Sequence, residues 1–155
     1  MMAATMPEKP LKNTTAPQLA FPESALMLEN AAQLAALAAF LENSPPATIL
    51  LVSPPGAGRA LGVPWWQALQ ELAGELFSMN GAARRHRFFW ALDCADSPAF
   101  ALQALQPERG PASDYAICRN LRAKLAEPWA DRILPCPPPT LRVERYVTSR
   151  ESTVR

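Results

Sequence analysis

The segment from Thr48 to Val52 reads Thr-Ile-Leu-Leu-Val and is apolar on both faces that a β-strand would present. Successive side chains of a strand point to opposite faces, so a strand of this kind has to be covered on both sides. Strands buried in this way are typical of parallel sheets packed against helices. The segment therefore predicts an α/β fold with this strand near the centre of its sheet.

Strand-like and helix-like segments alternate along the rest of the chain, which favours a layered sheet with right-handed crossovers. Helices are predicted after the N-caps Asn30, Ser97 and Asn120 and from Pro64. We predict a three-layer α/β sandwich with a mostly parallel sheet of five or six strands and a flavodoxin-like winding. An α+β fold with antiparallel pairing near the C-terminus stays open, because the last two strands are short and proline-rich. The expected strands cover residues 25–28, 48–52, 88–92, 115–118, 132–135 and 141–144.

At 155 residues the chain suits one domain, which we place at residues 23–144. Residues 1–22 mix prolines with small polar residues and show no periodicity, so they are expected to form a flexible arm. Residues 145–155 are expected to form a flexible tail.

Composition argues against several classes of partner. A net charge of +1 provides no field that would attract nucleic acid or an anionic membrane, and no apolar run has the length of a membrane-spanning helix. Three cysteines do not describe a disulfide framework, so we expect a cytoplasmic protein. The cysteines form no Cys-x-x-Cys pair and His86 is the only histidine, so no metal site is expected. The sequence identifies no cofactor.

Residues 49–60, which include Ser53-Pro54-Pro55-Gly56-Ala57-Gly58-Arg59-Ala60, resemble the phosphate-binding loop of P-loop nucleotide hydrolases. In that pattern Ser53 replaces the first glycine, Arg59 the lysine and Ala60 the hydroxyl residue. Ala60 cannot ligate magnesium, and arginine does not reproduce the compact ammonium group of lysine. Two interpretations remain: a tight turn that needs Gly56 and Gly58 for backbone freedom, or an anion site without catalysis that uses free amides and Arg59.

A second pattern, Asp93-Cys94-Ala95-Asp96, follows the strand expected at residues 88–92. Two carboxylates at a strand end could act as acid and base or bind a divalent ion. Asp96 or Ser97 could instead cap the next helix, and we favour Asp96 as the cap. Asp93 has no obvious local role and is therefore the better functional candidate.

Cysteines lie at or just after the ends of three expected strands, at Cys94, Cys118 and Cys136. Carboxyl ends of parallel strands share one edge, where α/β folds hold their ligands. The simpler interpretation is that all three cysteines are buried as small apolar groups. If one of them is a reactive thiolate, Cys118 is the best candidate, because Arg119 follows it. His86 lies at the opposite end of its strand, within an Arg84–Arg87 cluster that we expect to be solvated.

Three functions are compatible with these patterns. The first is a small non-catalytic binding or regulatory domain that holds a small ligand, an anion among the candidates, at the carboxyl edge of the sheet. Its site would consist of Ser53, Gly56, Gly58, Arg59, Asp93 and Arg119. The second is an assembly protein that recruits a protein partner or self-associates through its terminal segments, and the third is an enzyme that uses Asp93 as a base or Cys118 as a nucleophile.

Overall fold

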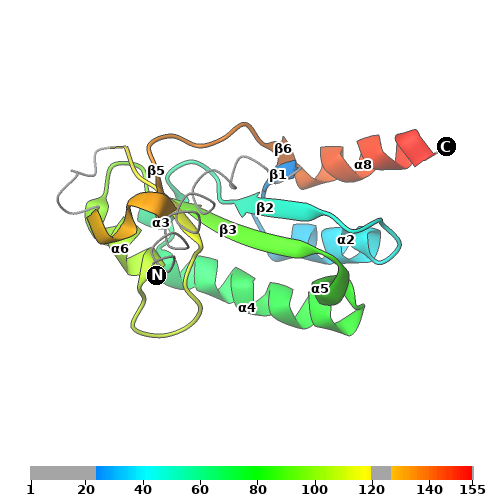
Figure 1. Cartoon of the computed structure of the whole chain (residues 1–155), viewed down its shortest axis with the longest axis horizontal. Helices are drawn as coiled ribbons and strands as arrows, with labels where there is room; N and C mark the ends of the chain where they lie inside the picture. Colours follow the sequence, from blue (N-terminus) through cyan, green and yellow to red (C-terminus); the bar gives the residue numbers. More distant parts are fainter. Residues whose placement is uncertain (1–23, 120–126, 155) are drawn as a thin grey trace, which may run out of the picture.

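The computed structural model describes residues 24–119 and 127–154, which build one six-stranded sheet (Figure 1). Every neighbouring pair of strands is parallel, and the order across the sheet is β5-β4-β3-β2-β1-β6. The α/β class and the parallel sheet are therefore confirmed, and the antiparallel alternative for the last strands is wrong. The strands are β1 Ser24–Met27, β2 Thr48–Val52, β3 Arg87–Asp93, β4 Tyr115–Ile117, β5 Ile133–Leu134 and β6 Leu141–Arg142.

The helices begin where the sequence supplies caps or proline. Asn30 accepts a hydrogen bond from the backbone N–H of Gln33, and Ser97 accepts one from that of Phe100. The helix expected after Asn120 lies outside the described residues. The described helices are α2 Ala31–Leu41, α3 Ala57–Ala60, α4 Val63–Met79, α5 Ala82–Arg85, α6 Pro98–Leu105, the 3₁₀ helix η3 Glu127–Arg132 and α8 Val143–Val154.

The strand order corrects the predicted winding. A flavodoxin-like sheet has the order 2-1-3-4-5, which places β1 between β2 and β3. Here β1 lies between β2 and β6, and the strands from β1 to β5 follow one another across the sheet. A succession of right-handed crossovers in one direction puts all the connecting helices on the same face.

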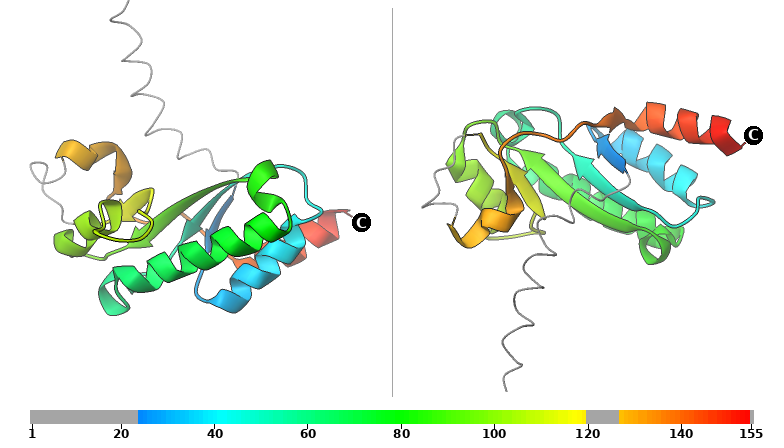
Figure 2. Two further views of the ribbon diagram at one scale, coloured as in Figure 1. Left: turned by 90° about the horizontal axis from the view of Figure 1, so that it is seen from below. Right: turned by 45° about the horizontal axis from the view of Figure 1, so that its top comes forward.

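The packing of the core agrees with this topology. Residues of α2, α4, α6 and α8 share one buried cluster with strand residues such as Leu26, Leu51 and Leu92. Leu50, Val52, Ala91, Tyr115 and Ile117, which point to the other face, form a second cluster made only of strand residues. Among the described residues the helices thus cover one face, where Figure 2 shows α2 and α4 side by side, so the predicted three-layer sandwich is reduced to two layers.

Helix α4 carries much of the helical face of the core. Its buried residues are Val63, Trp66, Leu69, Ala73 and Phe77. Trp65 and Leu72 are only half-buried at the margin of that face. The Phe77 ring stacks on that of Phe88 in β3 with centroids 4.2 Å apart. Trp66 is 1 % exposed and is one of the largest side chains of the core.

The end of the chain differs from the prediction of a loose tail at 145–155. Residues from Val143 to Val154 form helix α8, whose Val143 and Tyr146 are buried in the helix-face cluster. Helix α8 packs against α2 and β1 and then runs out beyond the body of the molecule (Figure 1). The apolar face made by Val143, Tyr146 and Val147 explains the helix, since burial of such a face stabilises it more than propensity does. None of the described helices is long and apolar enough to cross a membrane.

Candidate functional site

All six residues proposed for the site follow or end strands β2, β3 and β4, at the carboxyl edge of the sheet. Ser53 and Asp93 are directly joined, because the Asp93 backbone N–H donates to Ser53 Oγ at 2.9 Å. The Arg119 backbone N–H donates to the carbonyl of Ala95 at 2.9 Å, which links the turn after β3 to the end of β4. The parallel register thus brings together segments that are distant in sequence.

The amides of the glycine-rich turn are largely used inside the turn itself. The N–H of Ala57 donates to the Pro54 carbonyl, and those of Arg59 and Ala60 both donate to the Gly56 carbonyl. Pro54 and Pro55 have no N–H to offer. A phosphate cradle needs several amides pointing at the ligand, so this turn offers an anion much less than the sequence resemblance suggested.

The two glycines of this turn have structural reasons to be there. Gly56 has a φ of +71°, in the left-handed region that favours glycine. A Cβ on Gly58 would lie 2.9 Å from Cys94 Sγ and 3.1 Å from the carbonyl oxygen of Asp93. The turn is therefore packed directly against the end of β3, which supports the interpretation of a tight turn.

Asp93 is the most unusual group at this edge. It is 1 % exposed, and its Oδ1 accepts from the N–H of Ala95, which holds Ala95 at a φ of +55°. Its Oδ2 is buried, and no described residue donates a hydrogen bond to it. Leaving a buried polar atom without a partner is costly, so such an atom in a folded protein needs an explanation.

Asp96 does not cap the helix as predicted, since Ser97 does so. Its carboxylate forms an ion pair with Arg59 at 3.0 Å, and the two side chains are 52 % and 63 % exposed. Exposed ion pairs contribute only about 0–1 kcal/mol, so this pair can open at little cost. Arg59 is thus held over the turn after β3 while staying accessible.

The three cysteines are not equivalent. Burial, the neighbouring Cys118 and the charge of Asp93 together raise the pKa of the Cys94 thiol to about 12. Cys118 is buried too, and Cys136 is exposed in the segment between β5 and β6. No group of three or more histidine, cysteine, aspartate or glutamate side chains that could hold a metal ion is found within residues 24–119 and 127–154.

The winding also bears on whether an open crevice exists here. In doubly wound sheets a crevice forms where neighbouring connections leave on opposite faces. The connections that follow β2 and β3 lead to helices on the same face, and the turn after β2 closes onto β3. The candidate site therefore lies at the sheet edge around Asp93 and not at a switch point of the topology.

Two features were not found by sequence reasoning. The first is the role of His86, which is buried. Its Nδ1 accepts from the Ala47 N–H at 3.2 Å, and its Nε2 lies 3.1 Å from the Leu41 carbonyl. The neighbouring Arg85 donates to the carbonyls of Leu41, Glu42 and Ser44. This part of the basic cluster therefore closes the C-terminal end of α2. The only local hint was the position of the cluster directly before a strand.

The second feature is a groove of about 590 Å³ between α4 and α6. It depends on how two helices pack, which no local pattern encodes. Its walls are Pro64, Gln67, Ala99, Leu102, Gln103, Gln106, Pro107, Glu108 and Arg109.

In comparisons with protein-family models, curated proteins and solved structures, the chain matches none.

Proposed function

We propose that this protein is a small non-catalytic binding domain that holds a polar ligand at the carboxyl edge of its sheet, around Asp93. The observation that carries the proposal is the buried Oδ2 of Asp93, which has no donor among the described residues. A ligand that supplies an N–H, O–H or cationic group would satisfy this atom and gain a charge-assisted hydrogen bond.

The neighbouring charges suggest the other half of the ligand. Arg59 is exposed and only weakly held by Asp96, and Arg119 is exposed at the end of β4. Because the amides of Ala57, Arg59 and Ala60 are used inside the turn, we expect these guanidinium groups, rather than a backbone cradle, to hold an anionic group. A molecule with both a donor and an anionic group fits the edge better than a simple phosphate.

Binding without catalysis is favoured by the state of the nucleophile candidates. Cys118 is buried, and the raised pKa of Cys94 keeps its thiol protonated at neutral pH. His86, the one histidine of the chain, lies at the amino end of β3 and uses both ring nitrogens in contacts with the backbone. An enzyme would have to rely on Asp93 as a lone general base.

The test begins with native mass spectrometry of the purified protein, compared with its denatured mass, to detect a retained ligand. Thermal unfolding is then followed with three probes: putrescine, inorganic phosphate and phosphoethanolamine, which carries both an ammonium and a phosphate. We expect phosphoethanolamine to raise the midpoint most, because it carries both a donor for Asp93 and an anionic group for Arg59.

Two substitutions separate the contributions of the groups. Asp93→Asn should abolish the response to putrescine and phosphoethanolamine, and Arg59→Ala should reduce the response to phosphate and phosphoethanolamine only. Arg84→Ala, an exposed arginine at the opposite edge, is the matched control. A bare native mass together with no response to any probe would remove the proposal.

A second candidate function, assembly, is favoured by helix α8. Its second half projects from the body and would be available to a protein partner (Figure 1). Light scattering at several protein concentrations tests for self-association, and unchanged assembly after removal of residues 148–155 would argue against a role for the projecting half.

A further inference from the structure

The face of the sheet that carries no described helix is nevertheless buried. Val52, Ala91 and Ile117 point to this face, here called the strand-only face, and each of them is 2 % exposed or less. Asp93 lies on the same face, because alternate residues of β3 point to one side and Phe89 and Ala91 belong to it. A sheet face in contact with solvent would be more exposed, so another part of the chain covers its carboxyl half.

The topology identifies a described segment that can supply this cover. The crossovers from β1 to β5 advance in one direction across the sheet and place their helices on one face. The connection from β5 to β6 returns in the opposite direction, so a right-handed crossover places it on the strand-only face. This connection, residues 135–140, is called the strap here (Figure 1). It begins after Leu134, which lies in the same row of the sheet as Ile117 and Asp93, and it has to pass the end of β3 to reach β6.

The strap has no polar attachment to the sheet. No hydrogen bond or ion pair joins residues 135–140 to the described part of the chain. Four of the six strap residues are proline, which has no N–H to donate. A proline-rich cover buries Asp93 Oδ2 without giving it a donor, in agreement with the unpartnered state of this atom. Local opening costs least where few hydrogen bonds hold a segment to the body.

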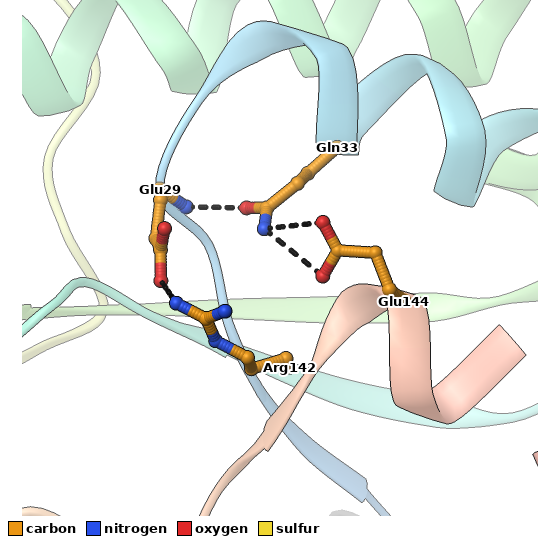
Figure 3. Close-up of polar contacts among 4 residues, drawn as sticks. All are labelled: Glu29, Gln33, Arg142 and Glu144. Carbon is orange, nitrogen blue, oxygen red and sulfur yellow. Dashed lines mark hydrogen bonds and ion pairs between the residues drawn. The ribbon is translucent and has the colours of Figure 1, made fainter.

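Both ends of the strap are lightly held. Strands β5 and β6 contain two residues each, and the chain bends at Pro135 and Cys136, so the strap is not stretched between them. On the β6 side, Arg142 forms an ion pair with Glu29 at 2.9 Å, and the Arg142 side chain is 61 % exposed (Figure 3). Exposed ion pairs of this kind contribute little stability. The buried Tyr146 keeps α8 on α2, so the strap and β6 can loosen without the helix.

We propose that the strap is a lid, which lifts from the strand-only face while the rest of the protein stays folded and thereby opens Asp93 to a ligand. This inference rests on the function proposed above, because it supplies the access that the buried Oδ2 of Asp93 requires. Segments with few contacts open locally far more often than the whole protein unfolds. Closure of such a lid shields the ligand from water and strengthens its hydrogen bond to Asp93.

Thiol labelling measures the opening without any ligand. Val52→Cys and Ala91→Cys, made separately in a Cys136→Ser background, place a thiol on the strand-only face. Cys94, buried in the helix-face cluster, is the internal control. Labelling with N-ethylmaleimide is followed by peptide mass spectrometry, and each rate is divided by the rate of the same thiol in unfolded protein. We expect this ratio to be at least about tenfold higher for the introduced thiols than for Cys94.

A flexible Gly-Ser-Gly-Ser insertion after Pro137 tests whether the strap is the part that opens. We expect it to raise the labelling ratio of both introduced thiols several-fold and to leave that of Cys94 unchanged, because it softens the strap alone. Introduced thiols that react as slowly as Cys94, or labelling that the insertion leaves unchanged, would overturn the lid. Two reporter positions are used because one substitution could disturb packing, and circular dichroism verifies that each variant is folded.

The lid and the ligand site can fail separately. Fast labelling of the introduced thiols without any thermal response to putrescine, phosphate or phosphoethanolamine would support the lid and remove the proposed ligand site. A thermal response to these probes with labelling as slow as at Cys94 would support the ligand site and overturn the lid.

Discussion

At the scale of single residues, Gly58 shows how closely the turn after β2 is packed onto β3. A Cβ at this position would lie 2.9 Å from Cys94 Sγ and 3.0 Å from Leu92 Cγ, both in the buried core. We predict that Gly58→Ala destabilises the protein by about 1–3 kcal/mol, the usual cost of overpacking.

Gly74 in α4 is the matched control, because a Cβ there meets nothing within 4 Å. Gly74→Ala is expected to stabilise the helix by roughly 0.5–1 kcal/mol. Urea denaturation of both variants measures the difference. Equal effects would mean that Gly58 has room that the structure does not show.

The thiols should differ sharply in reactivity. Cys136 is exposed, whereas Cys94 and Cys118 are buried and the pKa of Cys94 is raised to about 12. We predict that native protein reacts quickly with a thiol reagent such as Ellman's only at Cys136, and that Cys136→Ser protein reacts only after denaturation. Fast native modification of Cys118 would revive the enzyme hypothesis.

Asp93 marks the limit of prediction for single residues. Its position at the end of a strand was enough to select it, because parallel strands present their carboxyl ends at one edge. The environment of its two carboxylate oxygens could not be predicted, because it depends on tertiary packing. One oxygen accepts the hydrogen bond from the Ala95 N–H, and the other has no donor among the described residues. The same holds for the ion pair between Arg59 and Asp96.

At the scale of elements, the C-terminal end of α2 depends on a side chain that lies 45 residues beyond Leu41 in the chain. His86 accepts a hydrogen bond from the Ala47 N–H, its Nε2 lies 3.1 Å from the Leu41 carbonyl, and it is 3 % exposed. We predict that His86→Ala costs roughly 2–4 kcal/mol of unfolding free energy, because it leaves the Ala47 N–H without its partner and opens a cavity, while the Leu41 carbonyl keeps its bond from Arg85. Arg84→Ala, which changes an exposed neighbour, should stay within about 0.5 kcal/mol. Thermal and urea unfolding compare the two.

The loop before β4 should respond to pH. Asp114 accepts a hydrogen bond from the Trp90 N–H, and its pKa is raised by burial against the opposing effects of that bond and of Arg132. A carboxyl group with a raised pKa in the folded state loses stability as pH rises through its titration. We predict that Asp114→Asn, which keeps an acceptor oxygen, removes this loss, which sets in as pH rises above the ordinary aspartate pKa of about 3.9. Urea midpoints measured as pH rises from that value test it, and parallel pH curves for the two proteins would contradict it.

The caps and the proline predicted where helices begin better than which faces they bury. Asn30, Ser97 and Pro64 marked the starts of α2, α6 and α4. The buried face of α4 depends on packing, since Trp66 meets Trp90 and Phe77 stacks on Phe88. Helix α8 was missed because its apolar residues are few, and Val143 and Tyr146 become a helical face only against α2.

For the whole molecule, the strand order was beyond prediction because it is not written in any local pattern. Each strand and crossover looked the same under a flavodoxin-like order and under the observed one. In the observed order β1 to β5 follow one another across the sheet, and β6 is added beside β1. The crossing from β5 to β6 could have been suspected from the prolines between residues 135 and 139 only with the two sheet edges already known.

The attachment of helix α8 to α2 should weaken in acid. The pKa of Glu144 is lowered, chiefly by the hydrogen bond from Gln33 (Figure 3). A carboxylate with a lowered pKa contributes stability above its unfolded-state pKa of about 4.3, and this contribution is lost as pH falls through the folded-state value. We predict that Glu144→Gln reduces the loss of stability on acidification, opposite in sign to the effect at Asp114. A steeper acid transition in the variant would show that the Glu144 carboxylate is not what holds α8 on α2.

The strand order also has a kinetic consequence. Strands β1 to β4 each pair with the next strand along the chain, so the body of the sheet can assemble stepwise as the polypeptide leaves the ribosome. The contact between Gln33 and Glu144 joins residues 111 positions apart and closes late, because distant pairings are slow to form. During synthesis, the β1 edge therefore stays unpaired until almost the whole described chain has emerged.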